Sequence, residues 1–164
     1  MSRRQVDPLD TSLLFDVFAL NQAVGRLLAD SMRDAPLTPS EYAIYSAVFE
    51  LEAASPTVIA ARLGMRLTTF MDQLRVLERR GHAQRLPHPT DRRSYRVVLT
   101  ADGLAAHREA NRSFEAGAAA LAVALGDDEA AAKGALERMR TAADRARSRL
   151  EGPAATPRFA GRAG

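Results

Sequence analysis

The sequence contains no cysteine and no tryptophan, and its aromatic residues make up only 5% of the chain. Without cysteine, a disulfide framework, a thiol redox switch and a Cys-ligated zinc are all excluded. No apolar run approaches the roughly 20 residues of a membrane-spanning helix, and the N-terminal MSRRQVDPLD lacks the apolar core of a secretory signal. We therefore expect a cytoplasmic protein whose 164 residues form one ordinary core plus extensions.

Catalytic and metal-binding patterns are equally absent. His82, His88 and His107 lie singly, without the paired spacing of metal ligands. No phosphate-binding glycine loop or nucleophile elbow occurs, and the carboxylates are scattered over faces expected to be solvated. The sequence therefore predicts no catalytic residue, no metal site and no cofactor.

Positive charge is concentrated in one segment. From Arg62 to Arg96, nine arginines stand against three acidic residues, a net charge of +6, whereas the remainder of the chain carries −3. Such an uneven distribution is typical of a nucleic-acid surface. Lysine occurs only once; the preference for arginine suits bidentate contacts with phosphate and guanine, and the base composition of a genome explains it equally well.

The stretch from about Ala54 to Thr100 has the pattern of a winged helix-turn-helix. Ser55 is the expected N-cap of a first helix, Pro56 its first residue, and Gly64 follows its end. After a tight turn, a second helix is predicted from about Leu67 to Arg80. Its apolar residues recur at helical spacing and predict one buried face: Leu67, Phe70, Met71, Leu74 and Leu77.

The other face of this second helix is polar and fits a DNA major groove. Two short strands, about 83–86 and 95–99, follow with a loop at 87–94 between them, and a DNA-binding wing needs cations that can enter the narrow minor groove. The predicted DNA contacts are Thr68, Thr69, Asp72, Gln73, Arg75 and Arg79 on the helix and Arg92, Arg93 and Arg96 on the wing.

The segments LTPSEY, RVLERRGHAQR and PTDRRSYRVVLTADG, with the helix-turn-helix between them, resemble the multiple antibiotic resistance regulator (MarR) family of bacterial winged-helix repressors. The similarity covers about residues 37–103 in detail and most of the chain by helix pattern. Its most specific part is LERRG followed by DRR and VLT at the family's spacing. The resemblance implies a homodimer that binds a pseudopalindromic operator and releases it when a small ligand binds, with aromatic carboxylates or phenols as candidate ligands.

One position departs from the family. At Asp72 many relatives carry an arginine that contacts bases, and an acid cannot bind phosphate. Asp72 could accept a hydrogen bond from cytosine N4, or it could pair with Arg75 or Arg79 as a structural partner. Gln73 could reach adenine N6 and N7. On the wing, Arg93 could either contact DNA or pair with Asp91, which is expected to hold the loop.

A first helix is predicted from about Thr11 to Arg33 with two apolar stripes, of which a surface helix of a monomer needs only one. We favour a second subunit as the cover of the second stripe, although burial within one large core would give the same pattern. The next helix, from the capping-box residue Thr38 to about Glu52, is mostly core. The resemblance places a ligand cleft nearby, so Tyr45 or Phe49 could line it, but packing is the favoured interpretation.

Two further helices are expected at about 101–125, capped by Thr100, and from Asp127 or Asp128 to about Leu150. The apolar side of the first comprises Leu104, Phe114, Ala118, Leu121 and Leu125, and the second has an alanine-rich seam. The predicted fold is mainly α with a small β-wing, in which terminal helices form a dimerisation bundle. Its predicted parts are 1–36 (dimerisation), 37–100 (DNA binding), 101–150 (dimerisation) and 151–164 (disordered tail).

The leading hypothesis is therefore a ligand-responsive, DNA-binding transcription regulator, most simply a repressor. The alternative is a winged-helix module that binds another protein without reading DNA, since a fold does not determine function. The arginines of the wing favour the first hypothesis, because a protein-binding wing has no need of three cations on one short hairpin.

Overall fold

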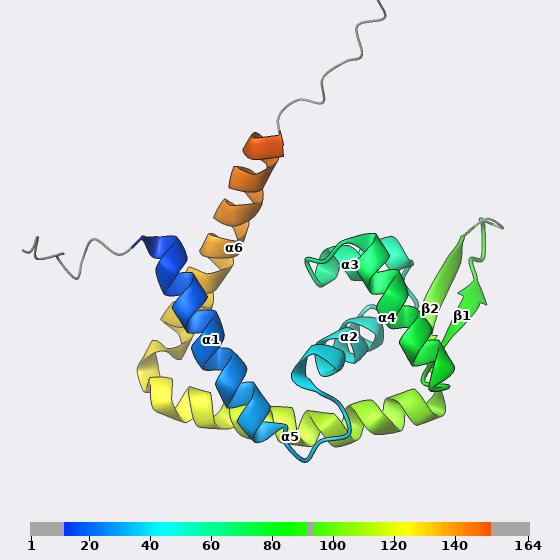
Figure 1. The fold of residues 1–164 in the computed structure, drawn as a ribbon, viewed down its shortest axis with the longest axis horizontal. Helices are drawn as coiled ribbons and strands as arrows, with labels where there is room; N and C mark the ends of the chain where they lie inside the picture. Colours follow the sequence, from blue (N-terminus) through cyan, green and yellow to red (C-terminus); the bar gives the residue numbers. More distant parts are fainter. Residues whose placement is uncertain (1–11, 92–93, 152–164) are drawn as a thin grey trace, which may run out of the picture. The chain divides into compact units, whose positions relative to one another are not determined.

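The computed structural model describes residues 12–91 and 94–151 (Figure 1). The chain divides into two compact units, residues 1–120 and 121–164, with the boundary inside one long helix. The elements in order are α1 (Leu13–Ser31), α2 (Pro39–Glu50), α3 (Pro56–Arg62), α4 (Leu67–Arg79), β1 (Ala83–Pro87), β2 (Tyr95–Leu99), α5 (Ala101–Leu125), a short 3₁₀ helix (Gly126–Asp128) and α6 (Glu129–Glu151). The predicted mainly helical fold with a two-stranded wing is confirmed.

Polar side chains begin the helices where the sequence predicts. The Thr38 hydroxyl accepts from the Glu41 N–H at 3.3 Å, while the Glu41 carboxylate accepts from the Thr38 N–H at 2.9 Å, which completes a capping box. Ser55 and Thr100 accept from the N–H groups of Val58 and Gly103. Each cap contributes about 1 kcal/mol by satisfying an otherwise unpaired N–H.

The core of the first unit lies between α2, α3, α4 and β2. Fully buried side chains come from all four elements and include Tyr45, Ile59, Phe70, Leu74, Leu77 and Val97. The predicted buried face of the second helix of the pair is therefore correct for Phe70, Leu74 and Leu77. It is wrong for Leu67, which is 44% exposed because it lies in the first turn of α4, ahead of the point where Phe70 enters the core.

The wing is an antiparallel pair in which Ala83 faces Leu99 and Pro87 faces Tyr95. It is joined to the segment before α3, because the Val97 N–H donates to the Ala54 carbonyl at 2.9 Å. That segment contains two left-handed residues that are not glycine, Glu52 (φ 41°) and Ala53 (φ 70°). The sequence pattern did not predict this turn, because glycine or asparagine normally occupies such positions.

Helix α5 follows the predicted face only in part: Leu104, Phe114 and Leu125 are half-buried, and Phe114 packs against the core. The buried residues of α5 are Gly103, His107, Ala110 and Gly117, whereas the predicted Ala118 and Leu121 are exposed. The reason is close approach of the backbone: a Cβ on Gly117 would lie 2.7 Å from the Ser31 hydroxyl of α1. Hydropathy periodicity favours large apolar side chains, so it missed a face made of small residues.

Helix α1 has no buried residue and exposes an apolar surface. Its exposed apolar side chains are Leu13, Leu14, Phe15, Phe18 and Leu20. In the second unit, α6 exposes Leu136 and Leu150 of its predicted seam. Within the ranges 12–91 and 94–151, no helix is both long and apolar enough to cross a membrane. Of the tail predicted at 151–164, Glu151 ends α6, and residues 152–164 lie outside the described residues.

Candidate nucleic-acid interface

The outward face of α4 is polar and accessible. Thr68, Thr69, Asp72, Arg75 and Arg79 are exposed and Gln73 is half-buried, while the opposite face of the helix packs into the core. Helix α3 packs against the start of this helix and the wing runs beside its end (Figure 1). The structure thus brings the six helical residues predicted as DNA contacts onto one surface of a helix-turn-helix.

The described arginines between residues 62 and 96 divide into those that form ion pairs and those that have no carboxylate partner. Four of them form ion pairs: Arg62 with Glu50 at 3.2 Å, Arg75 with Asp72 at 2.5 Å, Arg80 with Glu41 at 2.7 Å and Arg85 with Glu78 at 2.6 Å. Arg66 and Arg79 are exposed and have no carboxylate partner among the described residues. The net charge of +6 therefore overstates the number of cations available to a polyanion.

Arg66 is a candidate contact that the sequence analysis missed. It is the N-cap of α4, and its own side chain makes no capping hydrogen bond. A cation at this position lies beside the first turn of the recognition helix, close to the exposed Thr68 and Thr69. The signal that could have found it was its place immediately before the predicted second helix, whose N-terminal residues contact the DNA in helix-turn-helix complexes.

Asp72 takes the structural partner that the sequence analysis had considered. Its carboxylate accepts from the Arg75 guanidinium one turn further along α4, and both side chains are exposed. An exposed pair of this kind contributes only about 0.2–0.5 kcal/mol. Because the pair is weak and lies on the outward face, it neutralises the local charge without fixing Asp72 in the scaffold.

The tip of the wing is partly outside the described residues, and the predicted contacts Arg92 and Arg93 fall there. On the described side of the tip, the His88 Nδ1 atom accepts from the Asp91 N–H at 3.2 Å, and the Asp91 carbonyl accepts from the Ser94 N–H at 3.1 Å. Arg96, the third predicted wing contact, is half-buried on β2, and its Nε has no hydrogen-bond partner in the described part of the chain.

The wing is fixed to α4 by side chains from both strands. Arg85 of β1 donates two hydrogen bonds to Glu78, and its guanidinium lies 4.6 Å from the ring centroid of Tyr95. The hydrogen bond to Glu78 is the main cause that raises the pKa of Arg85. The Tyr95 hydroxyl donates to the sulfur of Met71 at 3.4 Å. The spacing between wing and recognition helix is thus set by contacts away from the exposed face.

A cleft of about 290 Å³ lies between α1, α2, α3 and α5 within the first unit. Its lining combines aromatic and apolar side chains with three polar groups, from Ser46, Glu50 and Arg62. The full lining is Leu28, Pro39, Tyr42, Ala43, Ser46, Ala47, Glu50, Arg62, Leu63 and Phe114. Neither Tyr45 nor Phe49 lines it: Tyr45 is fully buried in the core, as favoured from the sequence, while Phe49 is 50% exposed beside a smaller pocket.

His107 lies behind the wall of this cleft. Its ring stacks on Tyr42 with centroids 5.3 Å apart and lies 5.0 Å from the ring of Phe49. Its Nε2 atom shares a 3.1 Å hydrogen bond with the Ser46 hydroxyl. Burial is the main influence and lowers the pKa of His107, opposed by the charge of Glu50. The neutral ring therefore orients a hydroxyl that lines the cleft. No group of three or more potential ligands that could hold a metal occurs among the described residues.

These elements together define a winged helix-turn-helix protein. No protein-family profile matches the chain. Over 95 residues, or 58% of the chain, it is 32% identical to the HTH-type transcriptional regulator TtmR of Methylorubrum extorquens (strain PA1), and it spans about half (49%) of that curated relative.

Solved structures match over most of the chain. The transcriptional repressor CouR bound to a 23-mer DNA duplex has a TM-score of 0.71 at 25% identity, covering 87% of this chain and 99% of that chain. PcaV from Streptomyces coelicolor in complex with its natural ligand has a TM-score of 0.70 at 26% identity, covering 88% and 99%. MarR from E. coli shares the fold at 23% identity (TM-score 0.64; 79% and 96%). The chain therefore has the winged helix-turn-helix fold of the MarR-family regulators among these solved structures.

Proposed function

We propose that this protein is a ligand-responsive transcription regulator that binds DNA, acting in the cytoplasm as a repressor. The observation that carries the proposal is the outward face of α4, where Thr68, Thr69 and Arg79 are exposed on a helix-turn-helix. Two solved relatives support it, one as a repressor bound to a DNA duplex and one in complex with its natural ligand. In this arrangement α4 reads base edges in the major groove while the wing approaches the minor groove.

The protein acts as a homodimer in this proposal. Five large apolar side chains of α1 are exposed in the single chain, and a monomer rarely exposes so much contiguous apolar surface. A second copy of the same helix is the simplest cover, because a two-fold contact places the same patch on both sides. A two-fold protein then binds a pseudopalindromic operator whose half-sites lie roughly 10 base pairs apart, centre to centre.

The cleft of the first unit is the proposed effector site. The rings of Tyr42 and Phe114 offer apolar faces to a planar ligand, while Arg62 offers a cation whose only described carboxylate partner is Glu50, at 3.2 Å. An aromatic carboxylate or a phenolate fits this combination, because its anionic group can compete with Glu50 for the guanidinium. Arg62 belongs to α3, the helix that packs on the recognition helix, so a ligand that moves it changes the DNA-reading unit.

The DNA half of the proposal is tested by selecting bound sites from a random pool. Recovery of a two-fold sequence supports it, as does an affinity that falls steeply with salt. If the dimer neutralises about six phosphates, the slope of log affinity against log salt is about −5. A nearly flat salt dependence and no enriched sequence would instead favour the protein-binding alternative.

The effector half is tested with a panel of hydroxybenzoates and phenols on the selected site. Release of DNA by one of them, lost in Arg62→Gln and retained in Arg33→Gln, supports the cleft as the site. Arg33 is a matched control, because it is also an exposed arginine paired with a carboxylate, that of Asp30, and it neither lines the cleft nor lies on the predicted DNA-binding surface. Equal responses of both variants would place the effector elsewhere.

A further inference from the structure

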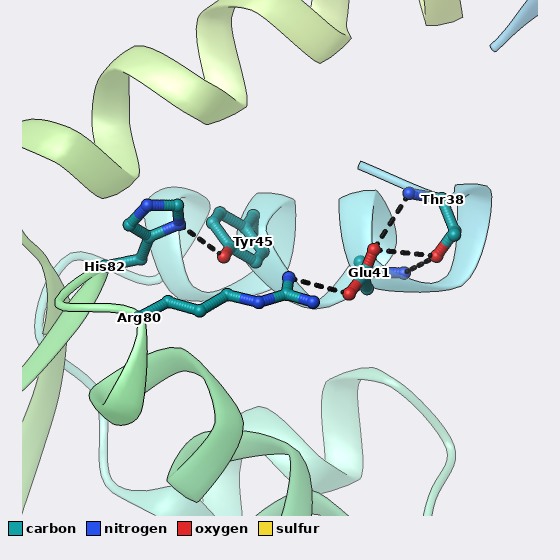
Figure 2. A network of polar contacts seen from close by, with 5 residues as sticks. All are labelled: Thr38, Glu41, Tyr45, Arg80 and His82. Carbon is teal, nitrogen blue, oxygen red and sulfur yellow. Dashed lines mark hydrogen bonds and ion pairs between the residues drawn. The ribbon is translucent and has the colours of Figure 1, made fainter. Parts of the chain in front are cut away.

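The end of α4 is built to direct two side chains toward α2. Arg80 caps the helix, Gly81 adopts a left-handed φ of 72°, and His82 follows. The Gly81 N–H donates to the Glu78 carbonyl and the His82 N–H to the Leu77 carbonyl, both at 2.9 Å. This reversal turns the chain sharply at the glycine, so that Arg80 and His82 both reach α2 (Figure 2).

Arg80 meets a carboxylate that is already held in place. Its guanidinium lies 2.7 Å from Oε1 of Glu41, whose other oxygen, Oε2, accepts from the N–H and the hydroxyl of Thr38 at 2.9 and 3.0 Å. Burial acts to raise the pKa of Glu41, but the hydrogen bonds from Thr38 and Arg80, together with the charge of Arg80, lower it overall. Glu41 is therefore ionised at neutral pH and only 21% of its side chain is exposed, whereas 43% of Arg80 is exposed.

A second contact joins the same two elements one turn along α2. The Tyr45 hydroxyl shares a 2.8 Å hydrogen bond with Nδ1 of His82, and Tyr45 is fully buried (Figure 2). The charge of Arg80 and a hydrogen bond with it also act on the Tyr45 hydroxyl, although burial raises the pKa of Tyr45 overall. The C-terminal end of α4 is thus attached to α2 at two points, on either side of Gly81.

We propose that Arg80 is a positioning residue that fixes the direction of the recognition helix against α2, and that it does not contact DNA. The role rests on the proposed function. Helix α4 has 13 residues, a length of roughly 20 Å, so a tilt of about 10° at its end moves its first turn by about 3.5 Å. Such a displacement exceeds the tolerance of a hydrogen bond to a base edge. Arg79, which is exposed and has no carboxylate partner among the described residues, is a cation at this end of α4 that remains available to a phosphate.

The geometry offers an isosteric test. Glu41→Gln removes the charge that holds Arg80, while glutamine at this position still completes the capping box. Arg80→Gln removes the other partner. Arg79→Gln is the matched control, since it changes the adjacent exposed arginine. All are made in the full chain, with folding checked by circular dichroism, and the readouts are affinity for the site selected by the wild type, affinity for random DNA, and the salt slope.

Glu41→Gln and Arg80→Gln are each expected to weaken binding to the selected site about tenfold, with unchanged affinity for random DNA and an unchanged salt slope. The double variant should lose no more than either single variant. Arg79→Gln should instead reduce the magnitude of the salt slope by about two, because the dimer loses one phosphate contact in each subunit. If Glu41→Gln binds as well as the wild type or better, and Arg80→Gln lowers the salt slope, Arg80 is a phosphate contact and the positioning role is wrong. Failure of the wild type to select any site overturns the proposed function instead, and the role with it.

Discussion

Replacing Gly103 by alanine is expected to destabilise the first unit, because the first turn of α5 packs directly on backbone. An added Cβ would lie 2.0 Å from the His82 carbonyl oxygen and 2.9 Å from its carbon. Ordinary van der Waals contact of a Cβ begins near 3.4 Å, so the added Cβ would lie 3.4 − 2.0 = 1.4 Å too close to the oxygen. The oxygen cannot move easily, since it also accepts from the Thr100 N–H at 3.0 Å in the turn that follows α4.

The magnitude follows from two opposing effects. Overpacking against an unyielding neighbour costs about 3 kcal/mol, and replacing glycine by alanine in a helix returns up to about 1 kcal/mol. We expect a net loss of about 2 kcal/mol in the free energy of unfolding, which corresponds to a fall in Tm of about 4–8 °C for a chain of this size.

Urea and thermal unfolding of the full chain, followed by circular dichroism, measure the effect. Gly25→Ala is the control: Gly25 lies within α1, and an added Cβ there meets nothing within 4 Å. That variant should gain about 0.5–1 kcal/mol. If Gly103→Ala is as stable as the wild type or gains like the control, the close approach of α5 to the turn after α4 is wrong.

Three further predictions concern pH, base reading and oxidation. Burial lowers the pKa of His107 from its ordinary 6.5, so the unfolded chain binds that proton more tightly. The stability that the neutral His107 ring contributes should be complete above pH 6.5 and should be lost as the pH falls through the pKa of His107 in the folded state. The free energy of unfolding of His107→Gln, measured against pH, should lack this loss. Asp72→Ala should change stability by under about 0.5 kcal/mol, strengthen binding to random DNA and relax the preference at one base pair per half-site; a selection that returns the wild-type site would make Asp72 a bystander. Peroxide should not release DNA in a gel-shift assay, because the chain has no thiol to oxidise; release reversed by added thiols would contradict this.

Local chemistry explains why much of the architecture was predictable from the sequence. Thr38, Ser55 and Thr100 begin helices because each side chain reaches an N–H three residues away, and Gly81 ends α4 because a left-handed residue is needed there. The helical spacing of the apolar residues likewise predicted the buried face of α4, and the residues between them predicted its polar face. The winged helix-turn-helix and the surface proposed to read DNA both depend on interactions within a few residues, which a sequence displays directly.

Only the tertiary structure decided which cations are engaged and which faces meet. Arg80 and Arg85 look identical to Arg79 in sequence, but each meets a carboxylate: Arg80 pairs with Glu41, 39 residues earlier, and Arg85 of β1 pairs with Glu78 of α4. The cleft combines residues from four helices, so no spacing could reveal Arg62 as its cation. Helix α5 buries glycine and histidine in preference to leucine, because the distance between two backbones, and not hydropathy, determines which side chain fits.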